Sequence, residues 1–119
     1  MRCEVWLEKA DSQRVWLANV GMASGFAQRA VGLLGRRHVA RDEGIILPRC
    51  ASVHTFGMRC AIDILFIDGE RRVLASREAL VPWRFAACRG ARDVIELGAG
   101  GLALAGVVSG DQLSIMETT

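Results

Sequence analysis

Polar side chains that could do chemistry gather in one short segment, residues 53–68, where the surrounding apolar pattern would place a core strand. A histidine and a carboxyl group could exchange protons with a substrate, and an arginine could bind an anion. Side chains alternate between two faces in an extended segment. His54 and Met58 would therefore share one face, and Thr55 and Arg59 the other.

Asp63 stands between two isoleucines in an otherwise apolar run. Burying a carboxylate without partners costs on the order of several kcal/mol or forces it to take up a proton. Arg59 is the expected ion partner, and backbone amides of a loop are the alternative. Two interpretations stay open: Asp63 braces a turn, or it lines a pocket.

In the second interpretation the pocket lies beside the loop Pro82–Arg92, which begins with a Pro-Trp-Arg sequence and belongs to a stretch without a period, residues 78–92. Long segments of this kind are often functional, and we expect Trp83 and Arg84 to act as a lid. The predicted ligand-binding residues are His54, Thr55, Met58, Arg59, Asp63, Trp83 and Arg84. The arginines favour an anionic small molecule or a carboxylate-bearing peptide as the ligand.

A complete catalytic set is not recognisable, and the G-x-S-x-G elbow of serine hydrolases is absent. Cys60 could act as a nucleophile with His54 as its base, but a cysteine inside a strand is more often a small apolar residue. The glycine-rich residues 98–103 lack the crossover helix and the acid of a dinucleotide site. Cys50, His54 and Cys60 match no standard zinc spacing, so we predict no metal and no cofactor.

Length and composition point to one domain over residues 1–119, with a hydrophobic fraction of 51%. The net charge is +2, and no basic stripe with interleaved aromatic residues predicts a nucleic-acid partner. The apolar runs are shorter than the ~20 residues of a membrane span. Charges interrupt the N-terminal residues, so we expect no signal peptide and a cytoplasmic protein, or an exported one if a leader has been removed.

The elements that must position these residues can be predicted from period and turn chemistry. Apolar residues between Ser24 and Gly35 recur at helical spacing, and these two residues suit the helix caps. Strands are predicted at residues 3–9, 14–20, 44–47, 53–60, 62–68, 72–76, 94–97 and 112–116, and one or two helical turns at 102–107. The expected fold is α+β and mostly β: a small curved or barrel-like sheet of about seven short strands with one or two short helices.

Six motifs occur in a fixed order along the chain. They are GLLGR (32–36), EGIIL (43–47), TFGMR (55–59), IDILFID (62–68), IELGAG (95–100) and GD (110–111). The series resembles the domain of unknown function 192 (DUF192) family of bacterial and archaeal proteins. The sequence HTFGMR, with the later Pro-Trp-Arg, resembles the branch found near tight-adherence pilus genes. Cys60 and Ala61 depart from the usual residues of the family, which weakens Cys60 as a catalytic residue.

The resemblance implies a small β-rich, barrel-like fold and no assigned activity. We therefore expect a non-enzymatic ligand-binding or accessory module with a polar pocket around residues 54–63. One alternative is a small hydrolase-like enzyme with Asp63 or His54 as the base. Another is a structural partner of a pilus or secretion assembly, with Trp6, Trp16 or Trp83 exposed at the interface.

Overall fold

The computed structural model of the chain describes residues 1–23, 33 and 35–118. The predicted helix between Ser24 and Gly35 lies, apart from Leu33, outside the described residues. The elements in chain order are β1 (Arg2–Glu8), the 3-10 turn η1 (Ala10–Ser12), β2 (Arg14–Met22), β3 (Glu43–Leu47), β4 (Ser52–His54), β5 (Ile62–Ile67), β6 (Val73–Leu80), β7 (Phe85–Ala87), β8 (Asp93–Gly98), α2 (Gly101–Ala105) and β9 (Gln112–Thr118). None of the helices in this part of the chain is long and apolar enough to cross a membrane.

Seven of the strands form one mixed sheet in the order β6-β5-β8-β3-β2-β1-β9, in which β2 and β3 run parallel. The sheet curves until its two edge strands approach each other at one end, where Arg72 bridges to Gln112 and Leu113 N donates to Arg71 O at 2.9 Å. This open, strongly curved sheet confirms the mostly-β prediction. The described chain has nine strands in two sheets, against the seven expected.

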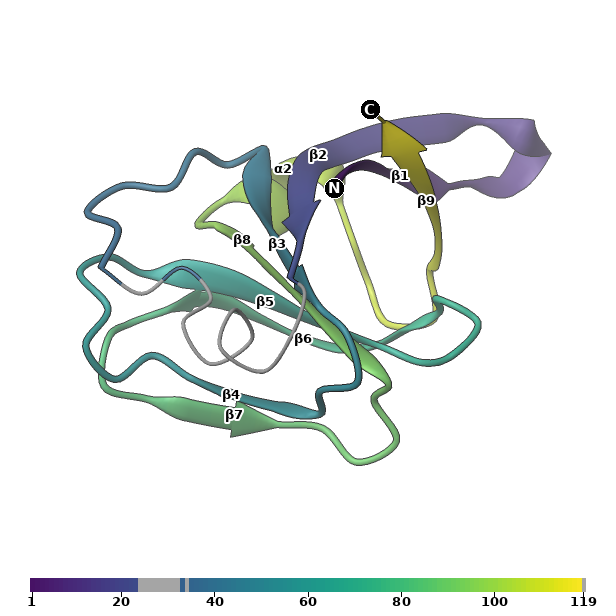
Figure 1. Cartoon of the computed structure of the whole chain (residues 1–119). Helices are drawn as coiled ribbons and strands as arrows, with labels where there is room; N and C mark the ends of the chain where they lie inside the picture. The colour runs from purple at the N-terminus through teal and green to yellow at the C-terminus, as the bar shows by residue number, and fades with distance from the viewer. Residues whose placement is uncertain (24–32, 34, 119) are drawn as a thin grey trace.

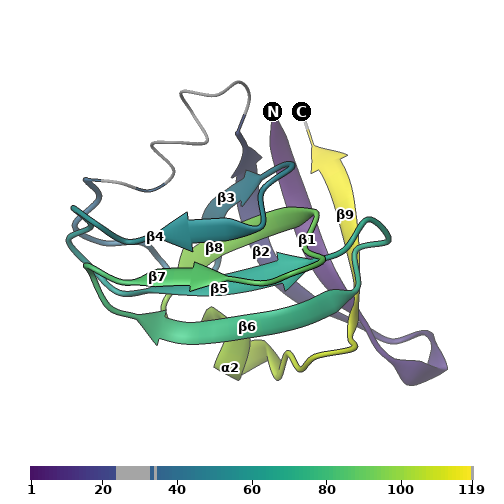
Figure 2. The ribbon, with the colours of Figure 1, turned by 90° about the horizontal axis from the view of Figure 1, so that it is seen from below.

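Strands β4 and β7 pair with each other and form a second layer over one face of the large sheet (Figures 1 and 2). An apolar cluster fills the space between the layers, with Val53 and Ala86 from the small sheet against Ile64 and Phe66 of β5. A second cluster covers the opposite face of the large sheet and includes Leu65 of the same strand. Because β5 is buried on both faces, its sequence is a continuous apolar run interrupted by Asp63.

The prediction of an extended segment over residues 53–60 is wrong, since β4 ends at His54 and a turn follows in which Gly57 has a φ of 81°. The prediction that residues 78–92 lack regular structure is also wrong, since β6 runs to Leu80 and β7 follows. Both errors reflect tertiary pairing, and the end of β6 exists as a strand because Leu80 pairs with Ile62 of β5. Strand β7 exists through its pairing with β4, a tertiary contact that local pattern does not encode.

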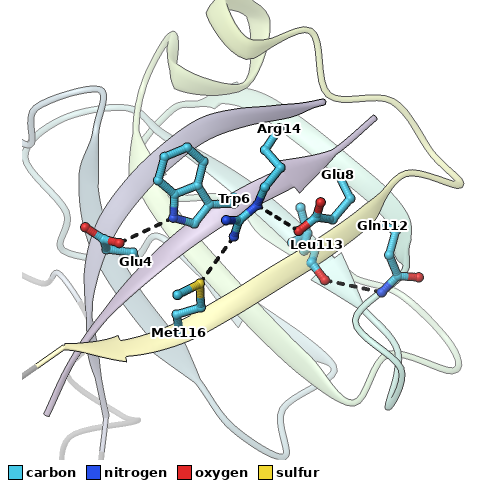
Figure 3. Close-up of polar contacts among 7 residues, drawn as sticks. All are labelled: Glu4, Trp6, Glu8, Arg14, Gln112, Leu113 and Met116. Carbon is cyan, nitrogen blue, oxygen red and sulfur yellow. Dashed lines mark hydrogen bonds and ion pairs between the residues drawn. The ribbon is translucent and has the colours of Figure 1, made fainter. Parts of the chain in front are cut away.

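Side chains cover the outer face of β1, β2 and β9 with polar contacts of their own (Figure 3). The guanidinium of Arg14 lies 4.6 Å from the centre of a Trp6 ring, and the Trp6 indole donates to Glu4 at 3.3 Å. Arg14 also donates to Glu8 at 3.1 Å and to the Met116 sulfur at 3.2 Å. Trp6 is therefore half-buried in this network and is not an exposed interface residue.

A first prediction tests the close packing of the large sheet against residues 39–40. A Cβ at Gly98 would collide with the carbonyl oxygens of Val39 and Ala40, whereas a Cβ at Gly69 would meet open space. We expect Gly98→Ala to lower the free energy of unfolding by about 3 kcal/mol, because two backbone segments must separate. Gly69→Ala should change it by less than about 0.5 kcal/mol. Urea denaturation of both variants measures the difference, and equal midpoints would contradict the packing.

Candidate functional site

The buried carboxyl group of Asp63 accepts three backbone hydrogen bonds. Its side chain is fully buried, and the register of β5 against β6 shifts at this residue. Oδ1 accepts from Ala79 N at 2.8 Å, and Oδ2 accepts from Gly100 N and Leu102 N, each at 3.1 Å. Asp63 thus ties β5 to the end of β6 and to the first residues of α2.

Backbone amides at the ends of β6 and α2, and not Arg59, are therefore the partners of Asp63. Arg59 is exposed, and the ion pairs within the described residues join Lys9 to Asp111, Arg14 to Glu8, and Arg36 to Glu43. The bend after His54 separates Arg59 from the extended register that would have brought it beside Asp63. The hydrogen bonds from these amides show that Asp63 stabilises the fold. Its predicted role in a ligand site stays a prediction.

Thr55 is the second fully buried polar side chain, and it joins the turn after β4 to the turn before β7. Its hydroxyl donates to Val81 O at 2.7 Å and accepts from Arg84 N at 2.8 Å. Its backbone N donates to Arg84 O at 2.8 Å, and its backbone O accepts from Met58 N and Trp83 N, each at 3.0 Å. One threonine therefore fixes both turns, and the side chains that flank it are held on a rigid support.

On this support three rings form a continuous stack that faces solvent. The rings of His54 and Phe56 are 5.0 Å apart at 29°, and those of Phe56 and Trp83 are 5.9 Å apart at 23°. Val81 and Phe85 are exposed beside them. We call these five side chains the aromatic surface. Its larger members are open to solvent to an unusual degree, with Trp83 at 66% and Phe85 at 65%.

The β4–β7 layer, which carries the aromatic surface, is rich in arginine, and Asp93 follows it directly and accepts from Arg49 N at 2.9 Å. Residues 48–61 and 81–92, which form the β4–β7 layer, contain five of the 15 basic residues of the chain and none of its 13 acidic residues. The arginines are Arg49, Arg59, Arg84, Arg89 and Arg92. All five are exposed, and none of them forms an ion pair within the described part of the chain. The layer is therefore far more cationic than the chain as a whole, whose net charge is +2.

The remaining predicted site residues divide between core and surface. Met58 is buried in the cluster between the two layers, whereas His54, Trp83 and Arg84 lie together around Thr55. Cys50 and Cys60 are free thiols. Among the described residues no group of three or more His, Cys, Asp or Glu side chains is placed to hold a metal ion.

Sequence reasoning missed Glu96, a buried carboxyl group in the middle of β8. It is 5% exposed and lies opposite Ile64 on one side and Ile45 on the other. Burial raises its pKa from the ordinary 4.5 to about 7, although a hydrogen bond from the Leu33 backbone opposes the shift. The signal that drew attention to Asp63, a carboxyl group inside an apolar strand, was present here as well. Phe56 and Phe85 were also missed as members of the site.

Comparisons with known proteins agree on the family and the fold. The model of the DUF192 family, described as "Uncharacterized ACR", matches residues 7–115. The UPF0127 protein of Thermococcus sibiricus (strain DSM 12597 / MM 739) is 33% identical over 105 residues, which are 84% of this chain and 68% of that protein. The UPF0127 protein of Thermococcus gammatolerans (strain DSM 15229 / JCM 11827 / EJ3) is 34% identical over 106 residues, 85% of this chain and 69% of that protein.

Two solved structures share the architecture. A Sinorhizobium meliloti 1021 protein, described as a proposed transcription regulator, is 27% identical with a TM-score of 0.85, covering 96% of this chain and 93% of its own. A protein of unknown function from Novosphingobium aromaticivorans DSM 12444 is 24% identical with a TM-score of 0.79, covering 93% of this chain and 83% of its own. The second likeness shows the fold alone.

A second prediction separates two aspartates by how their oxygens are used. Asp63 uses both oxygens, so Asp63→Asn turns an NH2 group toward a backbone N–H, and we expect a loss of about 3 kcal/mol of unfolding free energy. Asp68 accepts from Glu70 N at 2.8 Å and Arg72 N at 2.9 Å through Oδ1 alone, which asparagine retains. Asp68→Asn should therefore cost less than about 0.5 kcal/mol. Denaturant titration distinguishes the two, and similar losses would refute the assignment.

A third prediction concerns the pH dependence that Glu96 brings to stability. Because the folded chain binds the Glu96 proton more tightly than the unfolded chain, its stabilising effect is complete below pH 4.5 and is lost as the pH rises through about 7. We expect this carboxyl group to lower the unfolding free energy by about 3 kcal/mol between pH 4.5 and 8. Glu96→Gln should lack that decline and be more stable than the wild type at pH 8. Parallel pH profiles of the two proteins would contradict the proposal.

Proposed function

We propose that this chain, which belongs to the DUF192 family, is a binding module that holds a carboxylate-bearing peptide on the aromatic surface of the β4–β7 layer. The observation that carries the proposal is the solvent-facing stack of His54, Phe56 and Trp83 on a rigid, buried Thr55. Exposed apolar patches of this kind mark interaction sites, since single exposed side chains are common but contiguous ones are not.

Backbone strain at Trp83 supports a functional origin for the exposure. Trp83 has a φ of 68°, a conformation that a bulky side chain adopts at a cost of roughly 1–3 kcal/mol. The bond from Trp83 N to Thr55 O and the bonds of Arg84 to Thr55 hold the residue there. The strained backbone directs the Trp83 ring into solvent, where its exposed surface adds nothing to the stability of the core.

The arginines of the layer favour an anionic partner. Arg84 and Arg59 flank the aromatic surface in sequence, and neither has a carboxylate partner among the described residues. A guanidinium binds a carboxylate through two parallel hydrogen bonds, and the neighbouring rings can pack against apolar side chains of the same peptide. A peptide that alternates acidic and apolar residues satisfies both features at once. An acidic segment of a pilus or secretion protein would be a partner of this chemistry.

The fourth prediction tests this surface with a fluorescein-labelled peptide of alternating glutamate and leucine residues. We expect Trp83→Asn and Arg84→Gln each to weaken binding at least about tenfold, as the loss of a central contact does. Asparagine at position 83 tolerates a positive φ, so the turn should persist. Arg2→Gln, an exposed change on β1 in the other layer, is the matched control and should leave the affinity unchanged. Fluorescence anisotropy gives the dissociation constants, and thermal melts confirm that each variant is folded.

Two further probes decide what the surface recognises. A peptide with glutamine in place of glutamate should bind at least about tenfold more weakly, and equal binding would contradict the role of the arginines. Duplex DNA tests the alternative anion that the description of the Sinorhizobium meliloti relative suggests. Tight DNA binding that Arg84→Gln abolishes, without binding of the acidic peptide, would overturn the proposal in favour of a nucleic acid.

A further inference from the structure

A cavity of about 360 Å³ lies away from the aromatic surface, between β2, the residues that precede β3, and α2. Trp16 and Leu17 contribute one wall, and Leu104 and Ala105 contribute the other. Leu104 is 71% exposed and Trp16 39% exposed, so two large apolar side chains remain partly uncovered at the same hollow. A volume of this size, lined by apolar side chains together with polar groups, lies within the range of small-molecule sites.

Two charged residues, Arg41 and Asp42, also line the cavity. They are adjacent in sequence, yet they form no ion pair with each other or with any other described residue. The three ion pairs of the described chain join six other residues. Within the part of the chain that the structure describes, the backbone oxygen of Asp42 accepts from Asn19 N at 2.9 Å, and neither side chain forms an ion pair. One cationic and one anionic residue, both exposed, therefore border the cavity without an ion partner in the described chain.

Glycines allow this arrangement by bringing α2 close to Arg41. A Cβ at Gly101 would collide with the carbonyl oxygen of Arg41, and a Cβ at Gly100 would lie 3.2 Å from its Cδ. Asp63 holds the start of α2 in place through its bonds to Gly100 N and Leu102 N. The Arg41 side chain is thus packed along a fixed backbone, and the wall that carries Leu104 is held beside it. A site built on a fixed support needs little reorganisation to bind.

We infer that this cavity binds a free amino acid with a large apolar side chain. The α-carboxylate pairs with Arg41, the α-ammonium pairs with Asp42, and the side chain occupies the space between Trp16 and Leu104. This ligand class places one opposite charge on each unpaired residue and an apolar group on the apolar walls. A purely anionic ligand would leave Asp42 facing a like charge, and an uncharged one would leave both residues unpaired.

The test uses L-phenylalanine and two derivatives that each lack one charge. N-acetyl-L-phenylalanine has no ammonium group, and L-phenylalanine amide has no carboxylate. With the wild-type chain we expect phenylalanine to bind at least tenfold more tightly than either derivative, measured by isothermal titration calorimetry. The same titrations followed by amide chemical shifts should move the signals of residues 15–17, 40–42 and 101–105 and leave those of residues 81–85 unchanged.

Charge-removing variants assign each contact. Asp42→Asn should abolish the preference for phenylalanine over the N-acetyl derivative and keep the preference over the amide. Arg41→Gln should do the reverse. Trp83→Asn, a change on the aromatic surface, is the control and should alter none of these affinities. Both charge variants replace exposed side chains, so they are expected to fold like the wild type.

Three outcomes would overturn the inference. They are the absence of heat and of shift changes at millimolar phenylalanine, equal binding of all three compounds, and shift changes confined to residues outside the cavity. None of these results bears on the acidic-peptide proposal, because the two sites share no residue.

Discussion

The carboxyl group of Asp63 is the interaction on which the other features of the molecule depend. It lies in a strand that is buried on both faces, and it accepts from amides at the end of β6 and at the start of α2. The bond to Ala79 N, a residue with a φ of 50°, fixes the point from which the chain leaves β6 toward the aromatic surface. The bonds to Gly100 N and Leu102 N fix the wall of the amino-acid cavity. One buried side chain thus positions parts of both proposed sites.

Three buried polar side chains differ in how well hydrogen bonds compensate for their burial. Asp63 and Thr55 direct their oxygens at backbone groups that would otherwise be left without partners, so burial of these residues stabilises irregular backbone. Glu96 lies between isoleucines, and the hydrogen bond from Leu33 does not compensate for its desolvation, so its pKa rises to about 7. The first two residues therefore make turns rigid, whereas Glu96 makes stability depend on pH.

Local pattern was sufficient for much of the fold and for part of the site. The hairpin of β1 and β2, the buried strands β5 and β8 and the turn before β9 follow from alternation, apolar runs and turn residues. Asp63 stood out because a carboxyl group between isoleucines must have partners. Backbone amides were one of its two expected kinds of partner, but the particular residues could not be predicted, since their amides lie 16 to 39 residues away and reach it only through the curvature of the sheet. The same limit explains β7 and the stack of His54, Phe56 and Trp83, which depend on pairing between distant segments.

The two proposed sites differ in chemistry because different parts of the fold form them. Where Thr55 holds two turns together, the strained backbone exposes rings beside Arg84, an arrangement suited to a long, negatively charged partner. Where glycines let α2 approach residues 40–42, the backbone forms a hollow that presents both charges over a small volume. A hollow of about 360 Å³ bordered by both charges suits the small zwitterion that we propose. The positions and charges of the described residues therefore argue for two separate recognition tasks.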